Sequence, residues 1–147
     1  MDDRKAPIIT EQLLNQSIER VWKAITNSDE MVQWFFDDIP AFSPEEGFET
    51  KFIVALDNRT FTHLWKITEV EALKKIVYDW SYKEYSGKGI VIFELEEKEN
   101  DTLLRLTNTG LDSVPNDIPE FTRDACIGGW KYFINGRLKT YLDLVSD

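Results

Sequence analysis

The chain contains one histidine, His63, and histidine is the side chain whose usual pKa lies closest to neutrality. A histidine that acts as a general base needs a hydrogen-bonding partner, and Tyr78 or Tyr82 on the next predicted strand is placed to supply one. His63 also shares a strand face with Trp65, so a histidine that is simply packed in the core, or exposed at the surface, is the alternative. Asp79 falls on the opposite face of its strand, which argues against a His–Asp pair.

Three other patterns predict ordinary structure rather than chemistry. Asp37 and Asp38 are expected in a solvated loop, and no acidic spacing matches a calcium-binding loop. Cys126 lies on a predicted helix without an evident histidine partner, and a buried thiol is usually inert. Gly87-Lys88-Gly89 is too short for a phosphate loop and predicts a hairpin turn. The sequence therefore assigns no catalytic residue, no metal site and no cofactor.

Length and charge restrict the class of protein. At roughly 150 residues per domain, the 147 residues predict one domain over residues 1–147. The chain has 27 acidic and 17 basic residues and a net charge of −10, so neither nucleic acid nor a membrane surface is an expected partner. One cysteine excludes an internal disulfide, and one histidine excludes a multi-histidine zinc site. The absence of an apolar signal segment or membrane span predicts a cytoplasmic protein.

Aromatic residues are the unusual feature of the composition, at 13% of the chain. They fill cores, but they also line pockets for flat or apolar ligands. Three predicted elements are expected to bring such side chains to one space, with about half of them on a wall that a ligand can reach. The candidate ligand-binding residues are Trp34, Phe35, Phe36, His63, Trp65, Tyr78, Trp80, Tyr82, Phe93, Trp130, Phe133 and Ile134.

The N-terminal third predicts a strand followed by two short helices. Residues 7–14 are partly β-branched and predict the strand. Ser17 is placed to cap a helix over residues 18–26, whose apolar side chains recur at helical spacing. Ser28 is placed to cap a second helix over residues 29–35, with two acidic residues in its first turn.

The middle of the chain has the period of two that is typical of strands. Five strands are predicted, with short turns between them, which favours an antiparallel meander. The strands are expected near residues 48–54, 61–70, 75–85, 90–97 and 102–108, and the turns at residues 57–59, 72–75, 86–89 and 99–101.

The C-terminal residues return to helical spacing and predict one long helix over residues 119–144, with Asp117 as its N-cap. A long helix against an antiparallel sheet is an α+β layout. Gly128 and Gly129 interrupt the apolar face of this helix, at a cost of about 1 kcal/mol each relative to alanine. Two interpretations remain open: close contact between helix and sheet, or room for a ligand beside Trp130.

Two motifs resemble a known family. Glu19-Arg20-Val21-Trp22-Lys23-Ala24-Ile25-Thr26, followed by Met31-Val32-Gln33-Trp34-Phe35, resembles the opening of the family related to the C-terminal domain of the activator of Hsp90 ATPase. Gly129-Trp130-Lys131-Tyr132-Phe133, with Leu138 and Leu142, is similar to that family's ending. The resemblance covers essentially the whole chain. Phe36-Asp37-Asp38 departs from the family's Trp-Gly-Pro or similar sequence, so we expect a different pocket rim.

The family belongs to the START-like, or Bet v 1-like (SRPBCC), superfamily. The resemblance implies a helix-grip α+β fold: a curved antiparallel sheet around a long C-terminal helix, two short helices after the first strand, and a hydrophobic cavity between sheet and helix. It implies functions that range from lipid and polyketide binding, through cyclase or hydrolase activity, to co-chaperone binding. The fold alone does not choose among them.

Our first hypothesis is that the protein, as a monomer or homodimer, binds a small hydrophobic or aromatic molecule, lipid-like or polyketide-like, in that cavity without catalysis. One alternative is an interaction module for an Hsp90-type chaperone. The other is a cavity enzyme, a cyclase or hydrolase, that uses His63 or a tyrosine.

Overall fold

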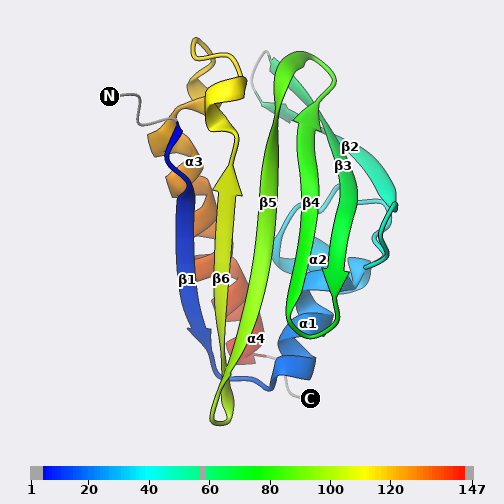
Figure 1. The fold of residues 1–147 in the computed structure, drawn as a ribbon, viewed down its shortest axis with the longest axis vertical. Helices are drawn as coiled ribbons and strands as arrows, with labels where there is room; N and C mark the ends of the chain where they lie inside the picture. The colour runs from blue at the N-terminus through cyan, green and yellow to red at the C-terminus, as the bar shows by residue number, and fades with distance from the viewer. Residues whose placement is uncertain (1–4, 57–58, 145–147) are drawn as a thin grey trace.

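The structure, a computed structural model, describes residues 5–56 and 59–144 of the chain. A strand and two helices come first, and five strands follow (Figure 1). These elements are β1 (Ile8–Leu14), α1 (Ile18–Thr26), α2 (Ser28–Trp34), β2 (Glu49–Leu56), β3 (Arg59–Glu71), β4 (Lys75–Tyr82), β5 (Tyr85–Lys98) and β6 (Asp101–Thr109). Short 3-10 turns η2 (Leu111–Ser113) and η3 (Pro119–Phe121) then lead to the C-terminal helix, made of α3 (Arg123–Trp130), η4 (Lys131–Leu138) and α4 (Lys139–Leu144).

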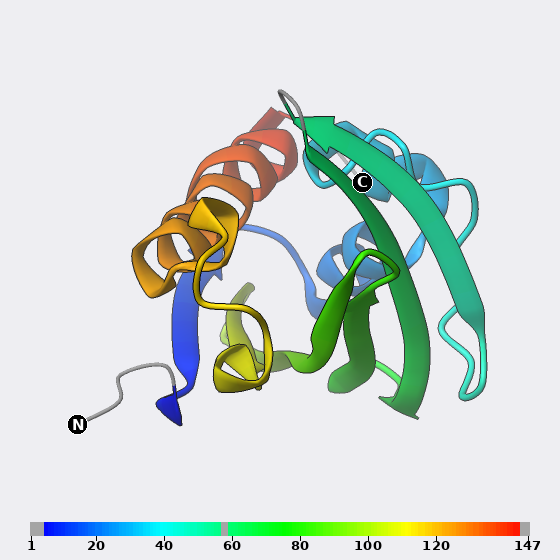
Figure 2. The same ribbon diagram turned by 90° about the horizontal axis from the view of Figure 1, so that it is seen from above.

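The six strands form one antiparallel sheet in the order β1-β6-β5-β4-β3-β2. Register shifts between Ile67 and Glu69, and between Ser81 and Tyr82, bend the strands that carry them. Seen from above, the sheet curls around, and the C-terminal helix lies along its β1 side (Figure 2). This arrangement confirms the predicted helix-grip α+β fold.

The two N-terminal helices follow the sequence prediction closely. Ser17 caps α1, because its hydroxyl accepts a hydrogen bond from the Arg20 amide at 3.2 Å. The cap predicted for α2 is wrong by one residue. Ser28 is already helical, and Asn27 occupies the cap position without a side-chain cap bond.

The turn predicted at residues 86–89 is wrong, because Gly87 and Gly89 lie inside β5 and the chain reverses at Lys83 and Glu84. Gly87 has a φ of 95°, and a Cβ there would lie 2.1 Å from the Ser113 carbonyl oxygen. The loop after β6 packs so closely against β5 that only glycine fits at position 87. Of the turn predicted at residues 57–59, residues 57 and 58 lie outside the described residues, and residue 59 begins β3.

The C-terminal helix differs from the continuous one predicted over residues 119–144. Pro119–Phe121 forms a separate 3-10 turn, and the helix begins after Thr122, whose hydroxyl accepts a hydrogen bond from the Ala125 amide at 3.2 Å. Asp117 is too far upstream to cap it. Over η4 the helix widens to π geometry. The wider turns help keep apolar residues spaced by four on the buried side: Trp130, Ile134, Leu138 and Leu142.

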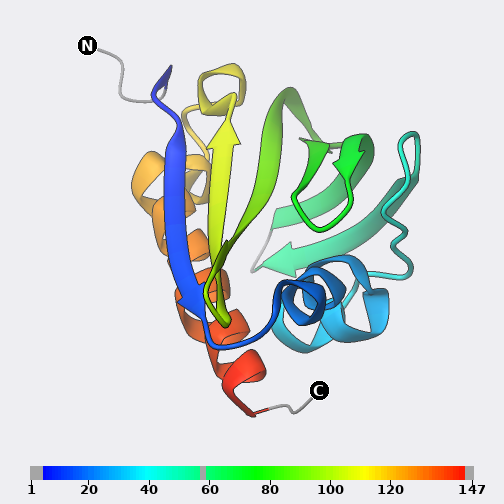
Figure 3. The same cartoon turned by 60° about the horizontal axis from the view of Figure 1, so that its bottom comes forward.

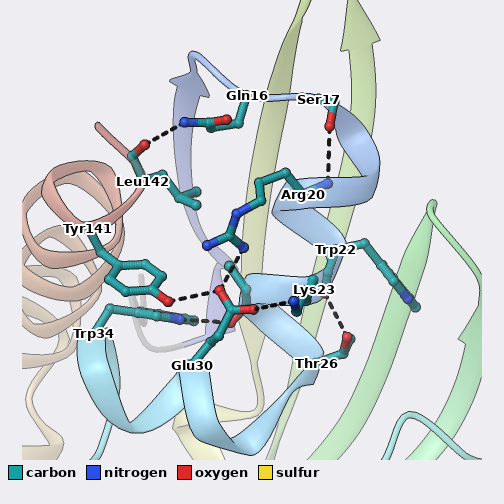
Figure 4. Close-up of polar contacts among 11 residues, drawn as sticks. Gln16, Ser17, Arg20, Trp22, Lys23, Thr26, Glu30, Trp34, Tyr141 and Leu142 are labelled. Atoms are coloured by element: carbon teal, nitrogen blue, oxygen red, sulfur yellow. Dashed lines mark hydrogen bonds and ion pairs between the residues drawn. The ribbon is translucent and has the colours of Figure 1, made fainter. Parts of the chain in front are cut away.

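α1 and α2 close the lower end of the fold beside the end of the C-terminal helix (Figure 3). Glu30 of α2 is only 8% exposed and joins three groups there (Figure 4). Arg20 Nη1 donates to Glu30 Oε1 at 2.6 Å, the Tyr141 hydroxyl donates to the same oxygen at 2.8 Å, and Lys23 Nζ lies 3.9 Å from Oε2. One carboxylate thus ties both short helices to α4.

The C-terminal helix also holds the end of α2. Arg137 donates to the Gln33 carbonyl at 2.8 Å and to the Phe35 carbonyl at 3.5 Å. Carbonyls at a helix C-terminus have no partner within their own helix and carry the negative end of its dipole, so a guanidinium is well suited to this place. On the other side, Trp34 Nε1 donates to the Ala24 carbonyl at 2.8 Å and fixes α2 against α1.

Two polar side chains of the C-terminal helix cover the outer edge of β1. Arg123 donates to the carbonyls of Ala6 and Pro7 at 2.7 and 3.2 Å, and Asn135 donates to the Glu11 carbonyl at 3.0 Å. An uncovered edge strand invites pairing with another chain. Asn135 occupies one acceptor of β1, and Arg123 binds the two residues just before the strand. The helix is therefore fastened along one edge of the sheet and at its lower end.

Replacing Glu30 by glutamine is expected to lower the free energy of unfolding by about 2–3 kcal/mol, because the largely buried ion pair between Glu30 and Arg20 is lost and the hydrogen bond from Tyr141 is weakened. Asp143→Asn is the matched control, because Asp143 forms an i,i+4 ion pair with Lys139 near the surface and its loss should cost less than about 0.5 kcal/mol. Urea denaturation measures both. Equal costs in the two variants would contradict an anchoring role for Glu30.

Candidate ligand-binding site

A cavity of about 320 Å³ lies between α3 and the concave face of the sheet. Its volume falls at the lower end of the range for small-molecule pockets. Most of the surface that faces it is apolar. It is lined by Phe36, Leu56, His63, Trp80, Tyr82, Gly89, Asn108, Thr109, Gly110, Leu111, Val114, Glu120, Phe121, Ala125, Cys126, Gly129, Trp130 and Phe133.

The cavity exists because the C-terminal helix packs tightly along only part of its length. Ile134, Leu138 and Leu142 are fully buried in the lower part, whereas Trp130 is the buried residue of α3. A Cβ built at Gly129 would meet nothing within 4 Å beyond its own helix backbone and chain neighbours. Close helix–sheet contact, one of the two interpretations of the glycine pair, is therefore wrong, and Gly129 lines open space.

The end of α2 forms the floor of the cavity. The helix ends at Trp34, so Phe35 and Phe36 leave helical geometry and both rings turn inward. Phe35 is 1% exposed and packs between the sheet and the C-terminal helix, with ring centroids 5.5 Å from Trp65 and 4.9 Å from Phe133. Phe36 lies above it and lines the cavity. One residue thus seals the core while the next faces the ligand space.

The sheet wall comes from β3 and β4, where strand parity holds as predicted. His63 pairs with Tyr82 and Trp65 pairs with Trp80 across the two strands. The His63 ring stacks on Phe52, with centroids 4.7 Å apart, and meets the Tyr82 ring edge-on at 4.9 Å. His63 and Tyr82 therefore share one wall of the cavity.

Burial controls the charge state of both groups. Loss of water around His63 lowers its pKa from the usual 6.5 to about 4, against the smaller opposing effects of the Phe61 carbonyl and the Glu84 carboxylate. Burial also raises the pKa of Tyr82, and the hydrogen bond from Trp80 only partly offsets this. Both side chains are therefore neutral near physiological pH.

Tyr78, the other tyrosine considered as a partner for His63, does not line the cavity. It is 1% exposed, and burial raises its pKa well above the usual value. Its hydroxyl and the indole nitrogen of Trp65 have no hydrogen-bond partner among the described residues. These two groups lie in the core, and Tyr82 is the tyrosine that meets His63.

A loop and an ion pair form the rim of the cavity. The Ser113 hydroxyl accepts from the Lys88 amide and donates to the Lys88 carbonyl, both at 2.9 Å, which holds the η2 loop on β5. Glu120 of η3 binds Arg59 at the start of β3 in a two-pronged pair at 2.9 and 3.0 Å. Arg59 holds the pKa of Glu120 below its usual value. The pair links the β3 end of the sheet to the helix entry.

The candidate residues predicted from the sequence divide into two groups. One group lines the cavity: Phe36, His63, Trp80, Tyr82, Trp130 and Phe133. The other lies in the core, away from the lining: Trp34, Phe35, Trp65, Tyr78, Phe93 and Ile134. Strand parity predicts which residues share a face of the sheet. It does not predict which of them the rings of Phe35 and Phe36 will cover.

Sequence reasoning missed the rim and part of the helix wall. The rim loop, from Gly110 to Val114, has no periodic pattern and depends on its contacts with β5. Cys126 and Ala125 on the helix wall had a usable signal. Cys126 precedes Gly129 and Trp130 by three and four residues, so all three share one helix face.

Other candidate chemistry stays outside the cavity. Asp37 and Asp38 are exposed, as predicted for a solvated loop. Within residues 5–56 and 59–144, no cluster of three histidine, cysteine or acidic side chains is arranged to hold a metal ion. Over the same ranges, no helix combines the length and apolarity needed to cross a membrane.

Solved structures with a similar fold cover nearly all of the chain. The Bacillus halodurans protein BH1534 is 23% identical, with 93% of this chain and 96% of that one covered and a TM-score of 0.74. The Aha1 dimer from Colwellia psychrerythraea is 19% identical, with coverages of 95% and 97% and a TM-score of 0.69.

DynU16, encoded in the dynemicin biosynthetic locus, is 22% identical with a TM-score of 0.73. The alignment covers 94% of this chain but only 47% of DynU16, so the chain spans about half of that protein. At these identities the similarity shows the fold alone.

Among curated protein sequences, none matches the chain. Residues 15–143 match the family model described as activator of Hsp90 ATPase homolog 1-like protein. This match spans most of the chain, and the curved sheet with its C-terminal helix is the START-like fold. The protein is therefore a member of the activator of Hsp90 ATPase homolog 1-like family, within the START-like superfamily.

Proposed function

We propose that the protein binds a small hydrophobic or aromatic molecule in the cavity between α3 and the sheet. The observation that carries this proposal is the open space beside Gly129, enclosed by aromatic side chains from α2, the sheet and the C-terminal helix. Water is poorly held in an apolar space of this kind, and an apolar group that displaces it gains affinity. A flat apolar ligand would provide such a group.

The chemistry of the lining favours binding over catalysis. His63 has a pKa of about 4 and is a weak base near neutral pH. Asp79, the carboxylate considered as a partner for His63, forms an ion pair with Lys88 at 3.3 Å. Glu84, whose charge acts on His63, accepts a hydrogen bond from the Thr62 amide. A cavity enzyme remains the second candidate, because His63 and the Tyr82 hydroxyl line the same space, as a cyclase or hydrolase would need.

A chaperone partner is the third candidate, and its support is the family description. The structural neighbour described as an Aha1 dimer extends this candidate to a second copy of the chain. Stimulation of the ATPase of an Hsp90 from the same organism, measured at low salt, tests it directly. We infer a cytoplasmic protein from the composition, with its single cysteine, Cys126, as a reduced thiol.

Replacing Gly129 by leucine tests ligand binding. The leucine side chain has room to enter the cavity, so we expect the affinity for the neutral fluorescent probe 6-propionyl-2-(dimethylamino)naphthalene to fall at least about tenfold. The matched control is Gly128→Leu, because Gly128 also has open space around it but is exposed outside the cavity.

Both leucine variants should gain about 1 kcal/mol of stability from helix propensity, so unfolding cannot explain a loss of binding. Probe fluorescence and thermal unfolding provide the two measurements. If the unchanged protein shows no probe binding, or if Gly129→Leu binds as well as Gly128→Leu, the proposal fails.

The pKa of His63 predicts a pH dependence of stability. The unfolded chain binds a proton near pH 6.5, whereas the folded chain does so only near 4. The unfolded state therefore holds more protons between these values, and stability is lost as the pH falls through this window. The expected contribution of this side chain is about 3 kcal/mol, to order of magnitude.

His63→Phe isolates this contribution, because the chain has no other histidine. Between about pH 7 and pH 4, the parent should lose about 3 kcal/mol more unfolding free energy than the variant, measured by urea denaturation at each pH. Parallel pH profiles for the two proteins would contradict the burial of a neutral histidine.

A further inference from the structure

The hydrogen-bonding state of His63 is fixed by its surroundings. Its Nδ1 lies 3.1 Å from the Phe61 carbonyl oxygen. A carbonyl can only accept, so Nδ1 of the neutral ring carries the proton and Nε2 is left as an acceptor. Among the described residues, no side chain or backbone group donates to Nε2. His63 therefore offers a free acceptor in the lining of the cavity.

Tyr82 has the complementary free group. Its hydroxyl oxygen accepts a hydrogen bond from Trp80 Nε1 at 2.8 Å, and an indole N–H can only donate. The Tyr82 proton is thus available, and within the described part of the chain no acceptor takes it. Because His63 and Tyr82 are register partners on β3 and β4, their rings meet on one wall of the cavity, with centroids 4.9 Å apart.

Asn108 and Glu120, two other polar residues of the lining, are already engaged. Asn108 Oδ1 accepts from Trp130 Nε1 at 3.2 Å, and its Nδ2 donates to the carbonyls of Ile90 and Thr109. The Glu120 carboxylate is paired with Arg59 at the rim. His63 and Tyr82 are therefore the groups best placed to orient a ligand.

We propose that the cavity selects an uncharged, flat apolar molecule that carries a hydroxyl group, which donates to His63 Nε2 and accepts from the Tyr82 hydroxyl. This inference rests on the proposed binding function and specifies its ligand class. A hydroxyl is the smallest group that satisfies both partners at once, and leaving either of them unpaired against a bound apolar surface would cost affinity.

The same lining disfavours an anion. None of the described residues that line the cavity is lysine or arginine, and Arg59 at the rim is already paired with Glu120. The chain as a whole carries a net charge of −10. A buried carboxylate without a cation loses its hydration and gains no compensating ion pair. Ionised fatty acids and aromatic acids should therefore bind poorly.

Four ligands with one ring system test this selection near pH 7: naphthalene, 2-methoxynaphthalene, 2-naphthol and 2-naphthoate. Their dissociation constants are measured by displacement of the fluorescent probe 6-propionyl-2-(dimethylamino)naphthalene. Naphthalene makes no conventional hydrogen bond, the methoxy compound only accepts, and naphthol both accepts and donates. Each added hydrogen bond should tighten binding about threefold to tenfold. The ionised 2-naphthoate should bind at least about 30-fold more weakly than 2-naphthol.

Two variants assign the bonds to their residues. In His63→Phe, which keeps a ring against Phe52, 2-naphthol should lose its advantage over 2-methoxynaphthalene. In Tyr82→Phe, 2-methoxynaphthalene should lose its advantage over naphthalene. Tyr132→Phe is the control for the second change, because Tyr132 is 59% exposed and outside the cavity.

These outcomes distinguish a failure of the inferred ligand class from a failure of the proposed binding function. If naphthalene and 2-methoxynaphthalene bind but 2-naphthol binds no better, or 2-naphthoate binds as well as 2-naphthol, the ligand class is wrong and the cavity still binds apolar molecules. If none of the four ligands binds, the proposed function itself fails. The comparison on the unchanged protein decides this even where a variant does not fold.

Discussion

The C-terminal helix is fastened at its lower end and along one edge of the sheet, and the remaining features of the structure depend on this constraint. Arg123 and Asn135 bond to the outer edge of β1, and Arg137 and Tyr141 bond to α2. On the side of the far strands, the Arg59–Glu120 ion pair holds the turn that precedes α3, and the sheet curves away from the helix itself (Figure 2). The space between them is therefore a consequence of geometry, and the aromatic side chains set how much of it is filled.

The opening motif shared with the family builds this support rather than the cavity. Arg20 binds the buried Glu30, and Trp34 bonds to the Ala24 carbonyl, so the motif residues fix α1 and α2 beneath the helix. Phe35, the last residue of the motif, seals the core, and the cavity begins at Phe36, where this chain departs from the family pattern.

The cavity combines an apolar wall with a small neutral polar group. Burial keeps both His63 and Tyr82 uncharged, since a charged form would have to exist without water or a counter-ion. The protein satisfies one side of each group, through the Phe61 carbonyl and the Trp80 indole, and leaves the other side free. His63 and Tyr82 can therefore orient a ligand. In the protein without ligand, the free side of each group can be hydrated through the cavity opening, so the unpaired side destabilises the fold little.

The sequence by itself determined the order of most elements, the α+β layout and the alternating faces of the strands, because period, capping residues and strand parity are local. The helix-grip class came from the resemblance to the family. The sequence also predicted that aromatic side chains from three elements converge, and the positions of His63 and Tyr82 on one face follow from that parity. Tertiary structure decided which rings form the wall and which fill the core, since Phe35 covers Trp65 and leaves Trp80 for the cavity. It also decided that Gly129 faces open space, that Gly87 belongs to a strand beneath the η2 loop, and that the helix begins at Arg123, with Thr122 as its cap. These features depend on contacts between residues far apart in the chain, which local spacing does not encode.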